Sequence, residues 1–110
     1  MKKLNEKEQA QVTGGYESSM SKEEIDRHKG ATVDKYDGIE GNTYVFERVN
    51  NTVVIVGKLV RTFEDEREYG STVRMHEVQI NAYIDSGCWY SVGETIRLNG
   101  DEYQIYEYID

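Results

Sequence analysis

Two long stretches decide the fold: residues 52–63, TVVIVGKLVRTF, and residues 72–84, TVRMHEVQINAYI. Both are rich in β-branched residues, which are stiff at the first side-chain torsion and pack well in a pleated sheet. The first stretch carries apolar residues at both odd and even positions, a pattern typical of a strand that is buried on both faces. Gly57 within it predicts a bend or a bulge.

The second stretch changes the phase of its apolar positions. Val73 and Met75 occupy one parity, whereas the later apolar residues occupy the other: Val78, Ile80, Ala82 and Ile84. Because side chains alternate between the two faces of a strand, this change predicts a bulge or a move between faces near His76-Glu77. Residues 64–71 between the two stretches are charged and predict a hairpin loop.

Shorter strands are expected on either side of these two, at residues 43–49, 88–92, 94–98 and 102–109. Asn99-Gly100 is the strongest hairpin signal in the chain. About six antiparallel strands with short links predict a mainly β protein, namely a small barrel or a strongly coiled sheet with a short N-terminal helix. A small two-sheet sandwich is the alternative.

Composition divides the 110 residues into three segments. Residues 1–15 are a leader or tail, residues 16–41 a polar linker with one short helix, and residues 42–110 the β domain. The helix is predicted by Ser21 and Glu24, which have the spacing of a capping box, and Ile25 is its only strong apolar anchor. Gly30 predicts a left-handed end to this helix, followed by a loop over residues 31–41.

Charge and residue usage exclude several classes of protein. Lys and Arg number 13 against 21 Asp and Glu, a formal charge of −8 that disfavours a general nucleic-acid binder. The single cysteine cannot form an internal disulfide. No apolar run approaches the ~18–20 residues that span a bilayer, so we expect no membrane insertion. No catalytic triad, P-loop or metal motif is present, so we expect no enzyme, cofactor or metal.

The N-terminal sequence LNEKEQAQVTGG, residues 4–15, is the one motif with specific content. Its apolar, acidic and glycine positions are Leu4, Glu8, Val12, Gly14 and Gly15. In this pattern it resembles the double-glycine leader of bacteriocin-type secreted precursors. Gln9 stands where that family usually has a leucine.

The resemblance implies a partner and a route of export. In the family, a peptidase-containing ABC transporter reads the apolar face of a short leader helix and cuts after the second glycine. Here the cut would fall between Gly15 and Tyr16, and the chain would be cytoplasmic as a precursor and secreted after leader removal. The alternative is an N-terminal tail in which the glycine pair has no function.

Aromatic residues supply a candidate binding surface for a protein or glycan target, namely Trp89, Tyr90, Tyr106 and Tyr108. Cys88 beside them is expected to be structural, or to pair between chains. The carboxylates in residues 64–68 are a weak Ca²⁺ candidate, as are those of Asp34, Asp37 and Glu40; in both places a solvated surface is the preferred interpretation.

A different class of function comes from residues 92–105, VGETIRLNGDEYQI. This stretch is similar to hairpins in phage-type head–tail connector barrels, where a glycine, an apolar strand and an Asn-Gly turn recur. The similarity implies an intracellular assembly module that forms ring oligomers and is not cleaved.

Overall fold

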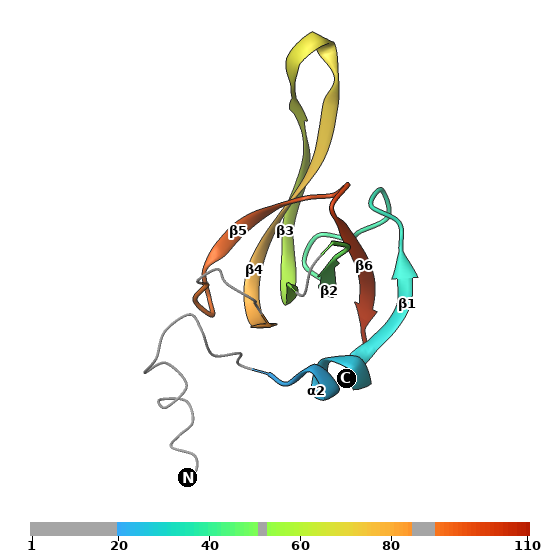
Figure 1. Ribbon diagram of the computed structural model, residues 1–110, viewed down its shortest axis with the longest axis vertical. Coiled ribbons are helices and arrows are strands. Elements are labelled where there is room, and N and C mark those ends of the chain that lie inside the picture. The colour runs from blue at the N-terminus through green and yellow to red at the C-terminus, as the bar shows by residue number, and fades with distance from the viewer. Residues whose placement is uncertain (1–19, 51–52, 85–89) are drawn as a thin grey trace.

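A single six-stranded antiparallel sheet with one helix forms the protein, in a computed structural model that describes residues 20–50, 53–84 and 90–110 (Figure 1). The helix is α2 (Lys22–His28). The strands are β1 (Lys29–Val33), β2 (Thr43–Arg48), β3 (Val54–Glu66), β4 (Thr72–Ile84), β5 (Thr95–Asn99) and β6 (Tyr103–Tyr108), and a short 3-10 turn, η2 (Glu68–Gly70), links β3 to β4. The mainly β class with about six strands is confirmed.

The strand order is β1-β6-β2-β3-β4-β5, so the sheet stays open. The expectation of a closed barrel is wrong, and so is the two-sheet alternative for the described strands. β6 pairs with β2 on one side and with β1 on the other, so β1 rather than β5 lies beside it. The edge strands of the described sheet are β1 and β5, and the sheet stays open because these two do not pair with each other.

The Asn99-Gly100 turn forms, but it does not make a hairpin. The amide of Glu102 donates to the carbonyl of Asn99 (2.9 Å), and the amide of Gly100 donates to the carbonyl of Arg74 on β4 (2.8 Å). A Cβ at Gly100 would lie 2.8 Å from that same carbonyl oxygen, so only glycine fits. The turn is thereby attached to β4, and β5 and β6 diverge to different partners.

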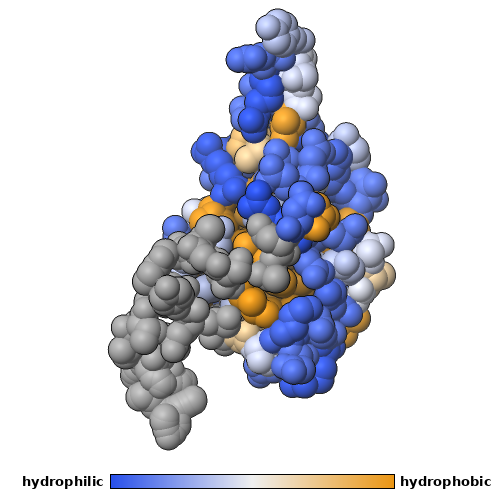
Figure 2. Space-filling view, viewed as in Figure 1, coloured by the Kyte–Doolittle hydropathy of each residue, from blue (hydrophilic) through white to orange (hydrophobic). Residues whose placement is uncertain are grey.

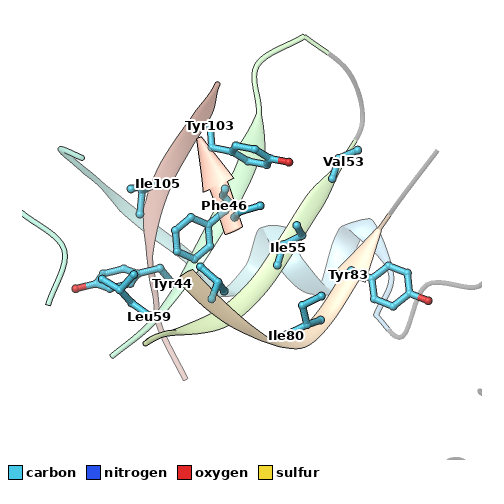
Figure 3. Packing of buried hydrophobic residues seen from close by; sticks show 11 residues of the cluster. Tyr44, Phe46, Val53, Ile55, Leu59, Ile80, Tyr83, Tyr103 and Ile105 are labelled. Atoms are coloured by element: carbon cyan, nitrogen blue, oxygen red, sulfur yellow. The ribbon is translucent and has the colours of Figure 1, made fainter. Parts of the chain in front are cut away.

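The main core lies on the inner face of the curled sheet, where side chains of β2 to β6 meet (Figure 3). Phe46, Ile55, Leu59, Val78 and Ile80 are its most buried members, each at most 1% exposed. Phe46 sits in the middle of the labelled side chains, with the ring of Tyr44 edge-on at 6.2 Å. Burial of aromatic and branched apolar side chains, about 1.5–3 kcal/mol each, is the main stabilising contribution here.

A second core lies on the outer face, beneath α2. Val45, Val54, Val56 and Ala82 form it together with Ile25, which is 1% exposed. This explains why the 52–63 stretch is apolar at both parities: its even positions face the helix and its odd positions face the inner core. Ile25 is the anchor that the sequence indicated.

Two irregularities interrupt the pairing of the long strands, and both lie next to positions that the sequence indicated. β3 and β4 lose register between Val56 and Gly57, opposite Asn81, and again between Leu59 and Arg61. The Gly57 bulge is confirmed, and a Cβ there would lie 2.5 Å from the carbonyl oxygen of Gln79. The irregularity between Leu59 and Arg61 lies opposite Val78 and Glu77, so the pairing is irregular near His76-Glu77 as expected. The apolar residues of β4 change face at Asn81, because Val78 and Ile80 face the inner core whereas Ala82 faces the helix.

The capping box of α2 is confirmed. The Ser21 hydroxyl accepts from the amide of Glu24 (3.2 Å), and the Glu24 carboxylate accepts from the amide of Ser21 (3.0 Å). The hydrogen bond from the Ser21 backbone lowers the pKa of Glu24. The end of the helix differs from the expectation: Lys29 is extended (φ −79°, ψ 119°) and the chain enters β1 directly, where a glycine stop and a loop were predicted.

Candidate interaction surfaces

The distal halves of β3 and β4 form an arm that projects from the body of the molecule (Figures 1 and 2). Its strand pairing runs from Arg61 opposite Glu77 to Glu66 opposite Thr72. The loop then closes with the amide of Arg67 donating to the carbonyl of Ser71 (2.7 Å). Of the charged loop predicted over residues 64–71, residues 64–66 are therefore paired strand of β3, and residues 67–71 form the loop itself. The molecule extends 52 Å along its longest axis against 27 and 25 Å along the others.

Tyr69 stands at the tip of this arm and is 100% exposed. Its backbone is left-handed, with φ 59° and ψ 28°, and Gly70 follows with φ 79°. A residue with a Cβ pays roughly 1–2 kcal/mol for this conformation. Such strain is concentrated at functional positions, and an exposed tyrosine offers a large apolar ring with a polar end.

The tip around Tyr69 is acidic. Residues 64–68 carry four carboxylates and one arginine, a side-chain charge of −4 + 1 = −3. Arg67 pairs with Asp65 (Nη2–Oδ2 3.3 Å), and Glu64 pairs with Arg74. Within the described residues no three His, Cys, Asp or Glu side chains are grouped to hold a metal ion. Successive carboxylates on a strand point to opposite faces, which keeps Asp65 apart from Glu64 and Glu66.

Arg74 fixes the base of the arm to the body. Its Nε donates to the carbonyl of Lys35 (3.1 Å), and its guanidinium lies 4.8 Å from the ring centroid of Tyr36. Its own carbonyl accepts from Gly100, as described above. Through its side chain and its carbonyl, this one residue joins the arm, the loop after β1 and the turn before β6.

A second set of contacts braces the other face of the arm. The Nε of Arg61 donates to Oε1 of Glu77 (2.5 Å), and Arg97 lies 3.7 Å from the other carboxylate oxygen. The hydrogen bond from Arg61, together with the two positive charges, lowers the pKa of Glu77. Both guanidiniums also lie over the ring of Phe63, at 4.4 and 5.3 Å from its centroid. We infer from these contacts that the arm is held in one direction.

A buried histidine lies at the root of the arm. His76 is 0% exposed, and its Nδ1 is 3.2 Å from the hydroxyl of Thr62 across the strand pair. Its Nε2 is buried and has no hydrogen-bond partner among the residues that the structure describes. Burial, and then the positive charges of Arg74 and Lys35, lower the pKa of His76. The neutral imidazole is therefore the form that the fold favours.

The outer face carries a groove of about 930 Å³ between the loop after β1 and the C-terminal end of β6. Ile39 and Ile109 line it and are 60% and 54% exposed, and Val56 and Ala82 lie in its floor. Four carboxylate side chains also line it, those of Asp34, Asp37, Glu107 and Asp110. Met20, at the start of the described chain, lies at the same groove.

Some of the candidate site residues that the sequence predicted lie in parts of the chain that the structure does not describe. Leu4, Glu8, Val12, Gly14, Gly15 and Tyr16, as well as Cys88 and Trp89, lie outside the described residues.

The structure separates the three remaining tyrosines of the candidate surface. Tyr90 packs edge-on against Tyr83 (5.8 Å) at the inner core, whereas Tyr106 and Tyr108 pack at the outer core. Lys29 lies over the ring of Tyr106 (4.6 Å), and His28 stacks on Tyr108 (4.7 Å). The three therefore do not form one surface. Sequence reasoning missed two exposed tyrosines of the described chain, Tyr36 (62% exposed) and Tyr69 (100% exposed). The only signal of Tyr69 is a Tyr-Gly pair at the end of the charged stretch.

Comparison with known proteins gives no relative. No family model matches the chain, and no curated protein or solved structure is significantly similar to it. In the described part of the chain, no helix combines the length and the apolar character needed to cross a membrane.

Proposed function

We propose that this chain is the precursor of a small exported binding protein. Residues 1–15 act as a double-glycine leader that a peptidase-containing ABC transporter removes, and the domain that follows binds a protein partner without catalysis. The arm is the contact element, and Tyr69 is the side chain that enters the partner.

The observation that carries this proposal is the exposure of Tyr69 at the end of a braced arm. Tyrosine is among the residues that contribute most to binding energy when a partner buries it. Its left-handed backbone is a stability cost with no compensating contact within the described residues, and a binding role would account for it. The four carboxylates beside it favour a partner with a basic surface around an aromatic-accepting pocket.

The position of the cut is compatible with a folded product. The members of both cores named above follow Met20, so cleavage between Gly15 and Tyr16 would leave those contacts in place. Residues 1–15 carry a side-chain charge of +3 − 2 = +1, so the mature chain would be more acidic, at −9.

Processing is tested with a purified peptidase domain of this transporter class and the intact mass of the product. We expect cleavage between Gly15 and Tyr16, its loss in Gly15→Ala and in Val12→Asp, and no change in Gln11→Ala, which lies in the leader between the recognised positions. An uncleaved wild-type chain, or equal cleavage of all four proteins, would refute the leader.

Binding is tested by placing a photo-crosslinking amino acid at position 69 and, as the control, at Val49, which is 60% exposed away from the arm. The mature protein is added to the native cells and their neighbours. We expect a crosslinked partner at position 69 alone. Equal labelling from both positions would count against the arm as the contact element.

The second candidate is the assembly module, and the open sheet is the observation that favours it. β1 and β5 each pair on one side only, which leaves two edges able to accept a strand from another copy. Light scattering after size-exclusion chromatography separates the candidates: a stable ring of full-length chains supports assembly, and a monomer at high concentration opposes it.

A further inference from the structure

We propose that the acidic groove on the outer face is the docking site of the chain's own N-terminal segment, residues 1–19. The groove, its lining and the connection at Met20 are features of the folded domain and do not depend on whether a transporter cuts the leader. The consequence for processing, drawn below, does rest on the proposed function.

The lining of the groove selects a basic and apolar occupant. Among the described residues that line it, four carry carboxylates and none is Lys, Arg or His. The ion pairs in the described part of the chain engage other carboxylates, so Asp37, Glu107 and Asp110 have no cationic partner there. Ile39 and Ile109 present exposed apolar side chains beside these charges. A segment with lysines and spaced apolar residues satisfies both features.

The N-terminal segment has that chemistry. Its basic part is residues 1–7, which hold three lysines, Lys2, Lys3 and Lys7, against one acid, Glu6; residues 8–19 add two glutamates and no Lys or Arg, so the lysines at the start of the segment would make the polar contacts. Leu4 and Val12 are eight residues apart, a spacing that places them on one face of a helix. The lysines would face the free carboxylates, and the two apolar residues would contact Ile39 and Ile109.

The connection makes the contact intramolecular. Met20 lines the groove, so the segment starts at the site it would occupy. The 19 residues before it reach up to roughly 60 Å when extended, which exceeds the 27 and 25 Å widths of the molecule. A tethered segment has an effective concentration in the millimolar range, so weak contacts are sufficient. A second copy of this chain is a poorer occupant, because each copy carries a charge of −8 and repels the other.

Docking would compete with processing. The apolar side chains that would enter the groove, Leu4 and Val12, are the ones that a peptidase of this class would read. A docked leader is therefore hidden, and weakening the groove should raise the rate of cleavage. The same face of the segment would contact either the peptidase or the groove, but not both at once.

The primary test compares ¹H–¹⁵N spectra of the full-length protein with those of the Lys2→Gln/Lys3→Gln/Lys7→Gln variant. The three substituted lysines are far from the groove residues in sequence, so they alter groove resonances only if the segment lies in the groove. We therefore expect the amide resonances of Ile39, Gly41 and Ile109 to shift. The control, Lys22→Gln, removes one charge from the exposed face of α2 and should leave these resonances in place. Unchanged groove resonances in the triple variant overturn the proposal.

The spectra are also compared at two protein concentrations, which separates docking within one chain from docking between two chains. Resonance shifts that disappear on dilution would show that the segment binds in a second copy, which also overturns intramolecular docking. The cleavage rate is then measured for Asp37→Asn/Glu107→Gln and for the matched control Glu66→Gln/Glu68→Gln, which removes the same charge from the arm. We expect a several-fold increase for the groove variant alone, and equal rates would refute the competition.

The two proposals fail in distinguishable ways. If no peptidase cuts the wild-type chain, the leader hypothesis fails while the spectra still report on docking. If the chain is cut but the groove resonances do not respond, docking fails and the leader remains.

Discussion

Replacing Ile25 with alanine tests whether one side chain holds α2 on the sheet. The substitution removes three buried carbons, which at about 0.8 kcal/mol each corresponds to about 2.4 kcal/mol of lost burial. The cavity left above Val45, Val54 and Val56 raises the expected loss to the 2–5 kcal/mol found for such truncations. Ile25→Val removes one carbon and should cost about 1 kcal/mol.

The loss of stability in Ile25→Ala is limited because part of α2 can detach from the sheet. Its seven residues are too few to persist alone, since isolated helices need about 12–15. Its C-terminal end is held separately, because Nδ1 of His28 donates to the carbonyl of Ile109 (2.6 Å) and the amide of Ile109 donates to the carbonyl of His28 (2.7 Å). In Ile25→Ala the first turn should therefore detach, and the free energy of unfolding should fall by about 2 kcal/mol, the low end of the range.

Urea denaturation followed by circular dichroism gives the free energy of unfolding, and native-state hydrogen exchange reports detachment of α2. The control is Val49→Ala, a truncation at a side chain that is 60% exposed and lies outside the groove, which should stay within about 0.5 kcal/mol of the wild type. A loss in Ile25→Ala no larger than this control, with unchanged exchange in α2, would refute the anchoring role of Ile25.

Substitutions at four further sites have expected outcomes that urea titration can check. Gly57→Ala should lower the free energy of unfolding by about 1–3 kcal/mol in urea titration, because the new Cβ meets backbone at 2.5 Å. Gly30→Ala should cost less, since the Cβ there meets the movable end of Ile109, and equal costs would contradict this reasoning. Tyr69→Gly should leave stability unchanged or raise it by up to about 1 kcal/mol in the same titration while removing partner binding; a clear destabilisation would show that Tyr69 has a structural role. His76 has a folded-state pKa below its value of 6.5 in the unfolded chain, so its contribution to stability is present above that pH and is lost as the pH falls. The urea midpoint should therefore drop more between pH 7 and 5 in the wild type than in His76→Gln, and identical slopes would contradict the lowered pKa.

The parts of the fold that were predictable have strong local signals. β4 begins and ends where the 72–84 stretch indicated, and the Ser21 capping box and the Gly57 bulge were visible in sequence. β1 was not predictable, because Lys29–Val33 has little apolar content and becomes a strand only by pairing with β6. That same pairing makes β1 an edge strand, and the sheet stays open because β1 does not pair with β5 at the other edge.

The candidate surfaces were harder to predict, for a physical reason. Tyrosine patterns in sequence do not report which face of a curled sheet a residue occupies, and the bulge at Asn81 moved the phase of β4 by one residue. Tyr106 and Tyr108 look available in sequence, but α2 and β1 supply His28 and Lys29 to their rings. Tyr69 is distinguished by its backbone conformation and its place at the end of a paired arm, and neither property is local in sequence.

The attachment of the Asn99-Gly100 turn to β4 has a consequence for chemical ageing. Asn-Gly pairs lose ammonia when the glycine amide nitrogen attacks the asparagine side chain to form a succinimide. Here the Gly100 amide donates to Arg74, and the Asn99 side-chain oxygen accepts from the amide of Asp101 (2.7 Å), so nucleophile and target are both engaged. The folded chain should resist deamidation at this pair, and an acidic isoform should accumulate there mainly when the turn leaves β4.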